Sequence, residues 1–209
     1  GFEDLIKIDL SQSLVCSRDV IEHIYDLPAF FEITKPAKLN RHNTAAVLNS
    51  FFRNKEFTNV HHNAELIGST SSINKHRDSK IAYFDLRKEI IASLMPSKTE
   101  KEIEQLSKAT RGLIKSDIEQ FLFSSTLPLF HSAVLHTNTC DPTTGNWAER
   151  TLSFANYKLL AEKKSLKFRL VKYNEFNRNF LKKAILKMLN FILRISKSER
   201  LCPSFTIEY

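Results

Sequence analysis

The sequence predicts an α+β fold in which helices dominate, and three observations lead to that prediction. Gly and Pro are scarce, at 4 and 6 of 209 residues, which is unusual for a chain built of many tight turns. Hydrophobic residues make up 42% of the chain and include 16 Phe, enough to build a core. Apolar residues recur at three- and four-residue steps in several segments and alternate only in a few short ones.

The first part of the sequence predicts two short helices followed by a loop. Ser17 can cap a helix that ends before Pro28, because a proline ends the preceding helical pattern. Asn43 can cap a second helix, with apolar residues between Val47 and Phe52. Residues 58–80 are rich in Ser, Asn and His and predict a long loop.

Helices are also predicted further along the chain. One covers residues 81–94 and ends at Pro96. Ser97 and Glu100 have the spacing of a capping box, and the helix they open runs to Leu122, although Gly112 lies within it. A strongly amphipathic helix is predicted over residues 179–195.

Strands are predicted at three places. Alternating apolar and polar residues indicate strands near residues 4–10, 166–172 and 204–208. Residues 147–162 fit a helix or a mixture of strand and helix.

Positive charge is concentrated at the end of the chain. Residues 151–209 contain 13 Lys and Arg but 4 Asp and Glu, whereas residues 1–150 are almost neutral. Residues 138–146 have turn-forming composition just before this shift. The sequence therefore predicts a mainly helical domain over 1–137, a linker or exposed loop over 138–146, and a basic α/β region over 147–209.

The basic region is the candidate binding site. A strand near residue 168 and the helix at 179–195 could place their cations on one surface, where they would neutralise phosphates without reading a base sequence. The same pattern also fits a solvated helix face or a surface for an acidic protein. The candidate nucleic-acid-binding residues are Lys167, Arg169, Lys172, Arg178, Lys182, Lys183, Lys187 and Arg194.

Two patterns raise the possibility of an enzyme. The turn Gly68-Ser69, followed by Asp78 and Asp85, has the residue types of a nucleotidyltransferase, but the carboxylates are seven residues apart instead of two. Glu162 and Lys164, preceded by Asp141, have the residue types of a metal-dependent nuclease. Both patterns also fit ordinary surface residues.

No complete catalytic set emerges, so we expect a non-enzymatic chain without a cofactor. Two histidine sets lack the spacing of a zinc site, and no metal ligand is predicted. The sets are His61, His62 and His76, and His131, His136 and Cys140.

Composition also indicates the compartment. The three cysteines, Cys16, Cys140 and Cys202, are far apart and odd in number, which argues against a disulfide scaffold. No apolar run is long enough to span a membrane, and the first residues do not form a secretory signal. We therefore expect a cytoplasmic protein without a membrane partner.

A further pattern covers about residues 149–192 of the basic region. Its positions are Arg150, Leu152, Phe154, Glu175, Phe176, Asn179, Lys183, Leu186 and Leu189. At these positions the stretch resembles the McrC family, the nuclease subunit of McrBC-type restriction systems. The resemblance implies that the family's Asp…Glu-x-Lys nuclease core would follow this stretch, and too few residues follow Ile195 to hold it. The chain would then be an N-terminal portion or a divergent member without the core.

These observations together predict a DNA-associated, non-catalytic module of a restriction or defence system. Its partner would be DNA, contacted at phosphates through the basic region. The alternative is a protein interaction module that docks through residues 179–195, for example onto a McrB-like AAA+ GTPase. A divergent nucleotidyltransferase or nuclease is the third possibility.

Overall fold

One four-stranded sheet joins segments from the beginning and the end of the chain. The computed structural model describes residues 2–45, 47, 65–66, 81–128, 131, 138–146, 148–173, 179–196 and 202–208. The chain divides into two compact units. The first consists of Gly1–Arg53 with Thr151–Tyr209, and the second of Asn54–Arg150.

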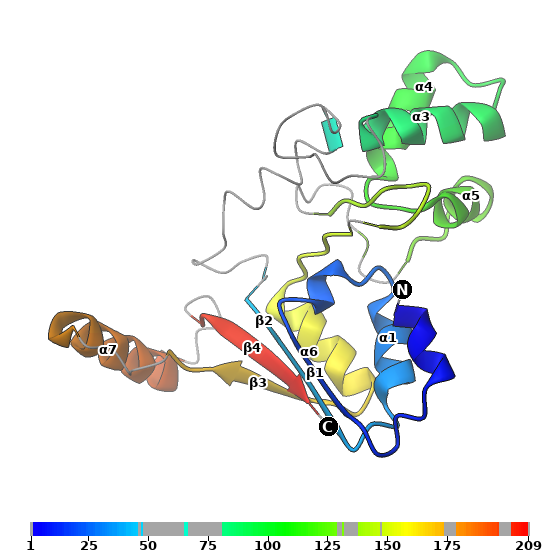
Figure 1. The fold of residues 1–209 in the computed structure, drawn as a ribbon. Coiled ribbons are helices and arrows are strands. Elements are labelled where there is room, and N and C mark those ends of the chain that lie inside the picture. Colours follow the sequence, from blue (N-terminus) through cyan, green and yellow to red (C-terminus); the bar gives the residue numbers. More distant parts are fainter. Residues whose placement is uncertain are drawn as a thin grey trace. The chain divides into compact units, whose positions relative to one another are not determined.

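The sheet belongs to the first unit and has the strand order β1-β2-β4-β3 (Figure 1). Strand β1 (Leu14–Arg18) lies parallel to β2 (Leu39–Thr44). Strand β4 (Ser204–Glu208) is antiparallel to both β2 and β3 (Lys167–Val171). Two parallel strands need a crossover connection, and helix α1 lies within the one that joins β1 to β2.

Helices α1 (Leu27–Thr34) and α6 (Phe154–Lys163) cover the same face of this sheet (Figure 1). Asp26 caps α1 by accepting a hydrogen bond from the amide of Ala29, and Ser153 caps α6 in the same way. The ring of Tyr157 in α6 packs against that of Phe205 in β4, with 4.5 Å between the ring centroids. This aromatic contact is part of the core of the first unit.

The second unit contains the helices α3 (Tyr83–Leu94), α4 (Glu100–Ala109) and α5 (Lys115–Ser124). Ile91, Leu113 and Ile118 are fully buried at its centre. A bridge between Thr139 and Glu149 pairs two further segments of this unit.

The structure confirms the predicted fold class. Helices outnumber strands among the described residues, and the strands share one sheet. The strands expected near 166–172 and 204–208 are β3 and β4. The helices expected at 81–94 and 179–195 are α3 and α7 (Phe180–Ser196).

The strand predicted near 4–10 is wrong, because Phe2–Lys7 is a 3-10 helix, η1. The apolar side chains of Ile6 and Ile8 that suggested alternation are exposed and line no sheet face. Ser17 caps no helix but lies in β1, which is followed by a short 3-10 helix, η2 (Ile21–His23). Asn43 likewise lies in β2.

The helix expected from Ser97 to Leu122 is divided in two. Its capping box consists of Thr99 and Glu102, two residues later than predicted. Gly112 has a φ of +72° between α4 and α5, a conformation that interrupts a helix and favours glycine. The glycine therefore marks a turn.

The segment 138–146, predicted as a linker or exposed loop, is buried at its beginning and exposed near its end. Asn138, Thr139, Cys140 and Asp141 are all at least 95% buried, whereas Thr143, Thr144 and Asn146 are exposed. The pairing of β2 with β4 joins residues before and after this segment in one sheet.

Candidate nucleic-acid interface

The sheet has a polar, cationic face opposite to the one that α1 and α6 cover. Strand register decides which residues share it, because side chains alternate between the two faces. Arg41 lies opposite Glu208, and Glu208 lies opposite Lys167. Along the strands, this face consists of Leu14, Cys16 and Arg18; Leu39, Arg41 and Asn43; Ser204, Thr206 and Glu208; and Lys167, Arg169 and Val171.

At the end of β4, an inner strand of the sheet, one carboxylate holds two arginines. Nη2 of Arg41 lies 2.8 Å from Oε2 of Glu208, and Nε of Arg169 lies 3.0 Å from Oε1. The Glu208 side chain is only 8% exposed, whereas those of Arg41 and Arg169 are 56% and 63% exposed. Each guanidinium has five N–H donors, so both keep donors for an anion from solution.

Three of the predicted site residues lie on or just after β3. Lys167 and Arg169 are exposed on the cationic face, and Lys172 is exposed just after the strand ends. Arg18, at the end of β1, is 85% exposed and lies 3.5 Å from Asp19. We call Arg18, Arg41, Lys167 and Arg169 the sheet cations.

The predicted cations on α7 form a separate group. Lys182, Lys183, Lys187 and Arg194 are all exposed, and no carboxylate of the described residues pairs with them. Helix α7 lies beyond the end of β3 (Figure 1). The sequence suggested that the cations of the strand and the helix share one surface. In the structure, those of β3 lie on the sheet face and those of α7 lie on the helix. Arg178 lies outside the described residues.

The sequence did not point to Arg18 or Arg41. Both lie in the nearly neutral first part of the chain, where the sequence predicts helix caps at Ser17 and Asn43 instead of strands. The residues of β2 that point into the core are polar: Asn40, His42 and Thr44 are fully buried. Without apolar residues at every second position, the strand lacked its usual signal.

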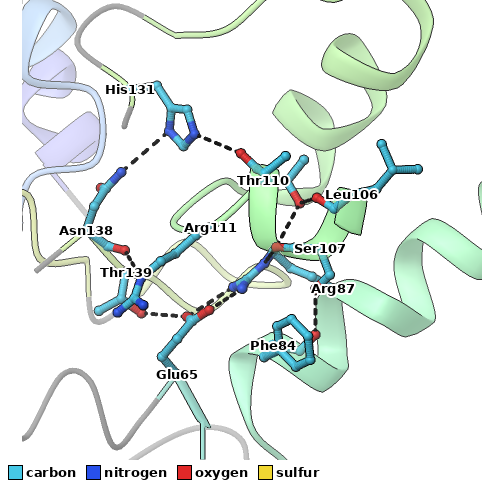
Figure 2. A network of polar contacts seen from close by, with 11 residues as sticks. Glu65, Phe84, Arg87, Leu106, Ser107, Thr110, Arg111, His131, Asn138 and Thr139 are labelled. Carbon is cyan, nitrogen blue, oxygen red and sulfur yellow. Dashed lines mark hydrogen bonds and ion pairs between the residues drawn. The ribbon is translucent and has the colours of Figure 1, made fainter. Parts of the chain in front are cut away.

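The second unit contains a buried polar network, shown in Figure 2. The carboxylate of Glu65 pairs with Arg87 and accepts a hydrogen bond of 3.1 Å from the hydroxyl of Thr139. Nε of Arg87 donates to the carbonyl of Ser107, and Nε of Arg111 donates to the carbonyl of Asn138. Because these donors and acceptors satisfy one another, the network holds segments of the unit together.

The structure describes two members of the set His131, His136 and Cys140: Cys140 is fully buried and His131 is half-buried. Burial raises the pKa of the Cys140 thiol to about 12, so it stays protonated at neutral pH. Burial also lowers the pKa of His131, whose Nδ1 lies 3.5 Å from the amide of Asn138. His136, and the other set with His61, His62 and His76, lie outside the described residues. Among the residues that the structure describes, no three His, Cys, Asp or Glu side chains converge as a metal site would require.

The two enzyme patterns do not form sites in the described residues. Asp85 is bound by Lys88 at 2.7 Å on an exposed turn of α3, and Gly68, Ser69 and Asp78 lie outside the described residues. Glu162 and Lys164 lie at the end of a helix, although the nuclease pattern needs a strand, and Lys164 pairs with Glu32 at 2.8 Å. Asp141 accepts two hydrogen bonds within its own turn.

In comparisons with protein-family models, curated proteins and solved structures, no match was found. The resemblance to McrC therefore stays a prediction. A search of the described residues for membrane spans found no helix with the required length and apolar character.

Proposed function

We propose that the chain is a DNA-associated, non-catalytic module that contacts phosphates through the sheet cations and the basic residues of α7. The observation that carries this proposal is the pair of exposed arginines held by Glu208. A buried carboxylate between them fixes two guanidinium groups before any ligand arrives, which lowers the entropy lost when a phosphate binds.

The residue types on this sheet face favour phosphate contacts over base recognition. None of the strand residues on the face is aromatic. Proteins that bind single strands usually stack bases on aromatic side chains, and none is present among these residues. We therefore expect binding to duplex DNA that depends little on its base sequence.

The biological setting rests on the resemblance to McrC. We infer a place in a restriction or defence system, and a cytoplasmic location, which three cysteines without a disulfide support. The chain would bind DNA while another subunit cuts it.

Fluorescence anisotropy with a labelled DNA duplex, repeated at several salt concentrations, tests the proposal. We expect affinity to fall steeply with salt, because bound phosphates release counterions. The decisive variant is Arg41→Gln/Arg169→Gln/Glu208→Gln, which removes both arginines together with the carboxylate between them. It should weaken binding and lower the logarithmic salt slope by about one for each lost contact.

The matched control is Lys101→Gln/Lys115→Gln, at two exposed lysines of the second unit. The control removes two positive charges, whereas the triple variant lowers the net charge by only one. If general charge governed binding, the control would lose more affinity. The proposal would be refuted if the control lost as much affinity for the duplex as the triple variant, or more. It would also be refuted if the affinity did not change with salt concentration.

The non-catalytic part of the proposal has its own test. Asp85→Ala and Glu162→Ala should leave unchanged any Mg²⁺-dependent nuclease or nucleotidyl transfer activity found in the preparation. Loss of such an activity in either variant would make the chain an enzyme.

A further inference from the structure

One side of helix α7 is apolar and exposed along its whole length. Its large apolar side chains are between 45% and 86% exposed. At 3.6 residues per turn they share one side of the helix. The members of this apolar stripe are Phe180, Leu181, Ile185, Met188, Phe191 and Ile195.

The opposite side of α7 is attached to its own unit. The side-chain amide of Asn190 donates to the carbonyl of Tyr173 at 3.0 Å and accepts from the Tyr173 amide at 2.8 Å. Leu186 and Leu193, on the same side as Asn190, are half-buried. These contacts direct the apolar stripe away from the unit.

Cations border the stripe. Lys183, Lys187 and Arg194 lie along one border, and Lys182 lies on the other. The 17 residues of α7 include no Asp or Glu. A long lysine or arginine side chain beside an apolar surface can place its methylenes on that surface and its charge in a polar layer.

We propose that α7 lies in the surface of an anionic phospholipid bilayer, which is a membrane partner that was not expected from the sequence. The apolar stripe contacts the acyl chains, and the bordering cations contact the lipid phosphates. The helix lies parallel to the membrane plane and does not cross the bilayer. The sheet cations take no part in this membrane contact, whereas the basic residues of α7 can contact either a lipid phosphate or a DNA phosphate.

Charge and shape favour the bilayer over other occupants. A second copy of α7 brings four more cations and no carboxylate, so paired helices would repel along their borders. The groove of a partner protein, such as a McrB-like AAA+ GTPase, would need acidic residues along both rims. An anionic bilayer supplies an apolar layer and negative charge along the entire stripe.

Vesicle flotation tests the proposal, with vesicles of phosphatidylcholine alone and of phosphatidylcholine mixed with phosphatidylglycerol. The full chain should float with the anionic vesicles and should remain unbound with the neutral ones. Met188→Ser/Phe191→Ser should lower binding about tenfold or more, because two exposed apolar side chains leave the acyl region. Lys187→Gln/Arg194→Gln should also lower it by about tenfold.

Phe123→Ser is the matched control for the apolar variant, since Phe123 is 70% exposed on α5 of the other unit. Its vesicle binding should equal that of the unchanged chain. Equal loss in this control, or no binding to anionic vesicles, would overturn the proposal. Self-association that Met188→Ser/Phe191→Ser abolishes would also overturn it, because the stripe would then be covered by a second copy.

DNA binding separates this inference from the proposed function. Met188→Ser/Phe191→Ser should bind the DNA duplex as the unchanged chain does, because neither residue contacts phosphate. The Arg41→Gln/Arg169→Gln/Glu208→Gln variant should still float with anionic vesicles. If each variant lost both activities together, α7 would not be a separate membrane contact.

Discussion

Nε and Nη2 of Arg41 both lie 2.8 Å from Oε2 of Glu208, although 167 residues separate the two in the chain. The contact joins β2 to the last strand and holds Arg41 on the cationic face of the sheet. It also makes the stability of the sheet depend on the residues that we propose for phosphate binding.

Removing the arginines without Glu208 should destabilise the protein. Arg41→Gln/Arg169→Gln leaves a nearly buried carboxylate without its two ion-pair partners, and we expect a loss of about 1–2 kcal/mol in the free energy of unfolding. This range is reduced because both arginine side chains are more than half exposed. Adding Glu208→Gln should restore most of the loss.

Urea denaturation followed by circular dichroism measures these differences. Lys7→Gln is the control, because it breaks an exposed ion pair with Asp4 in the same unit. That variant should unfold at the same urea concentration as the unchanged chain. A triple variant that is less stable than the double variant would show that Glu208 stabilises the sheet without the arginines.

The buried ion pair in the second unit should be among the most sensitive positions of the chain. Arg87 is fully buried and Glu65 is 2% exposed. Glu65→Leu leaves the guanidinium without its carboxylate and should cost about 3–5 kcal/mol in urea denaturation.

The double variant Glu65→Leu/Arg87→Met should cost less than the sum of its single variants, because no charge then stays buried alone. In the double variant, the Thr139 hydroxyl loses its acceptor and the Ser107 carbonyl loses its donor. The double variant should therefore remain less stable than the unchanged chain. Additive losses would show that the two residues stabilise the unit independently.

His42 should make stability depend on pH. Burial between the rings of Phe30 and Phe31 lowers its pKa from 6.5 to about 4. Below pH 6.5 His42 takes up a proton in the unfolded chain but not in the folded chain. The free energy of unfolding should therefore decrease as the pH falls from neutral towards 4. This decrease should reach about 3 kcal/mol.

Urea denaturation of the unchanged chain and of His42→Phe, each between pH 7.5 and pH 4, measures this contribution. His131 is half-buried and its pKa is also lowered, so it contributes to both curves in the same direction. The difference between the two curves therefore isolates His42. His42→Phe loses the hydrogen bond with Ser17, so its stability at neutral pH serves as the reference. Parallel curves would show that His42 does not cause the loss.

Two glycines with the same backbone conformation should respond differently to substitution. Gly112 and Gly145 have φ values of +72° and +73°. A Cβ at Gly112 would lie 2.9 Å from Oδ1 of Asn138 and 3.1 Å from its backbone carbon, whereas at Gly145 the nearest neighbour is a methyl of Ile114 at 3.4 Å.

Gly145→Ala should therefore cost about 1 kcal/mol from backbone strain, and Gly112→Ala about 2–4 kcal/mol from strain and contact together. Thermal unfolding of the two variants measures the difference. Equal costs would mean that Asn138 moves away without loss.

The periodic segments of the chain determined their own secondary structure. Residues 81–94 and 179–195 carry apolar residues at helical spacing, and both are helices in the structure. The strands near 168 and 206 were predictable from alternation for the same local reason. The exposed cations of β3 and α7 were also predictable, because charged side chains stay in water.

Strands β1 and β2 could not be predicted in this way. Their inward side chains include the half-buried Ser17 and the buried Asn40 and His42, which find polar partners in the fold: Ser17 binds His42, and Asn40 binds Thr34. The partners lie outside the strand itself, 25 residues apart for Ser17 and His42 and six for Asn40 and Thr34. A pattern of hydrophobic residues within one strand therefore cannot indicate that these polar side chains point inward.

The cationic sheet face depends on the same long-range pairing. Arg41 and Arg169 lie on strands far apart in the chain, and only the register of β2, β4 and β3 brings both to Glu208. The net charge of the last part of the chain indicated its basic residues as a candidate site. The tertiary structure added Arg18 and Arg41 to that site and showed that the cations of α7 form a group apart from the sheet cations. Net charge counts charged residues without regard to where they lie in space. A binding surface depends on which side chains lie next to one another, and the hydrogen bonds between strands decide that.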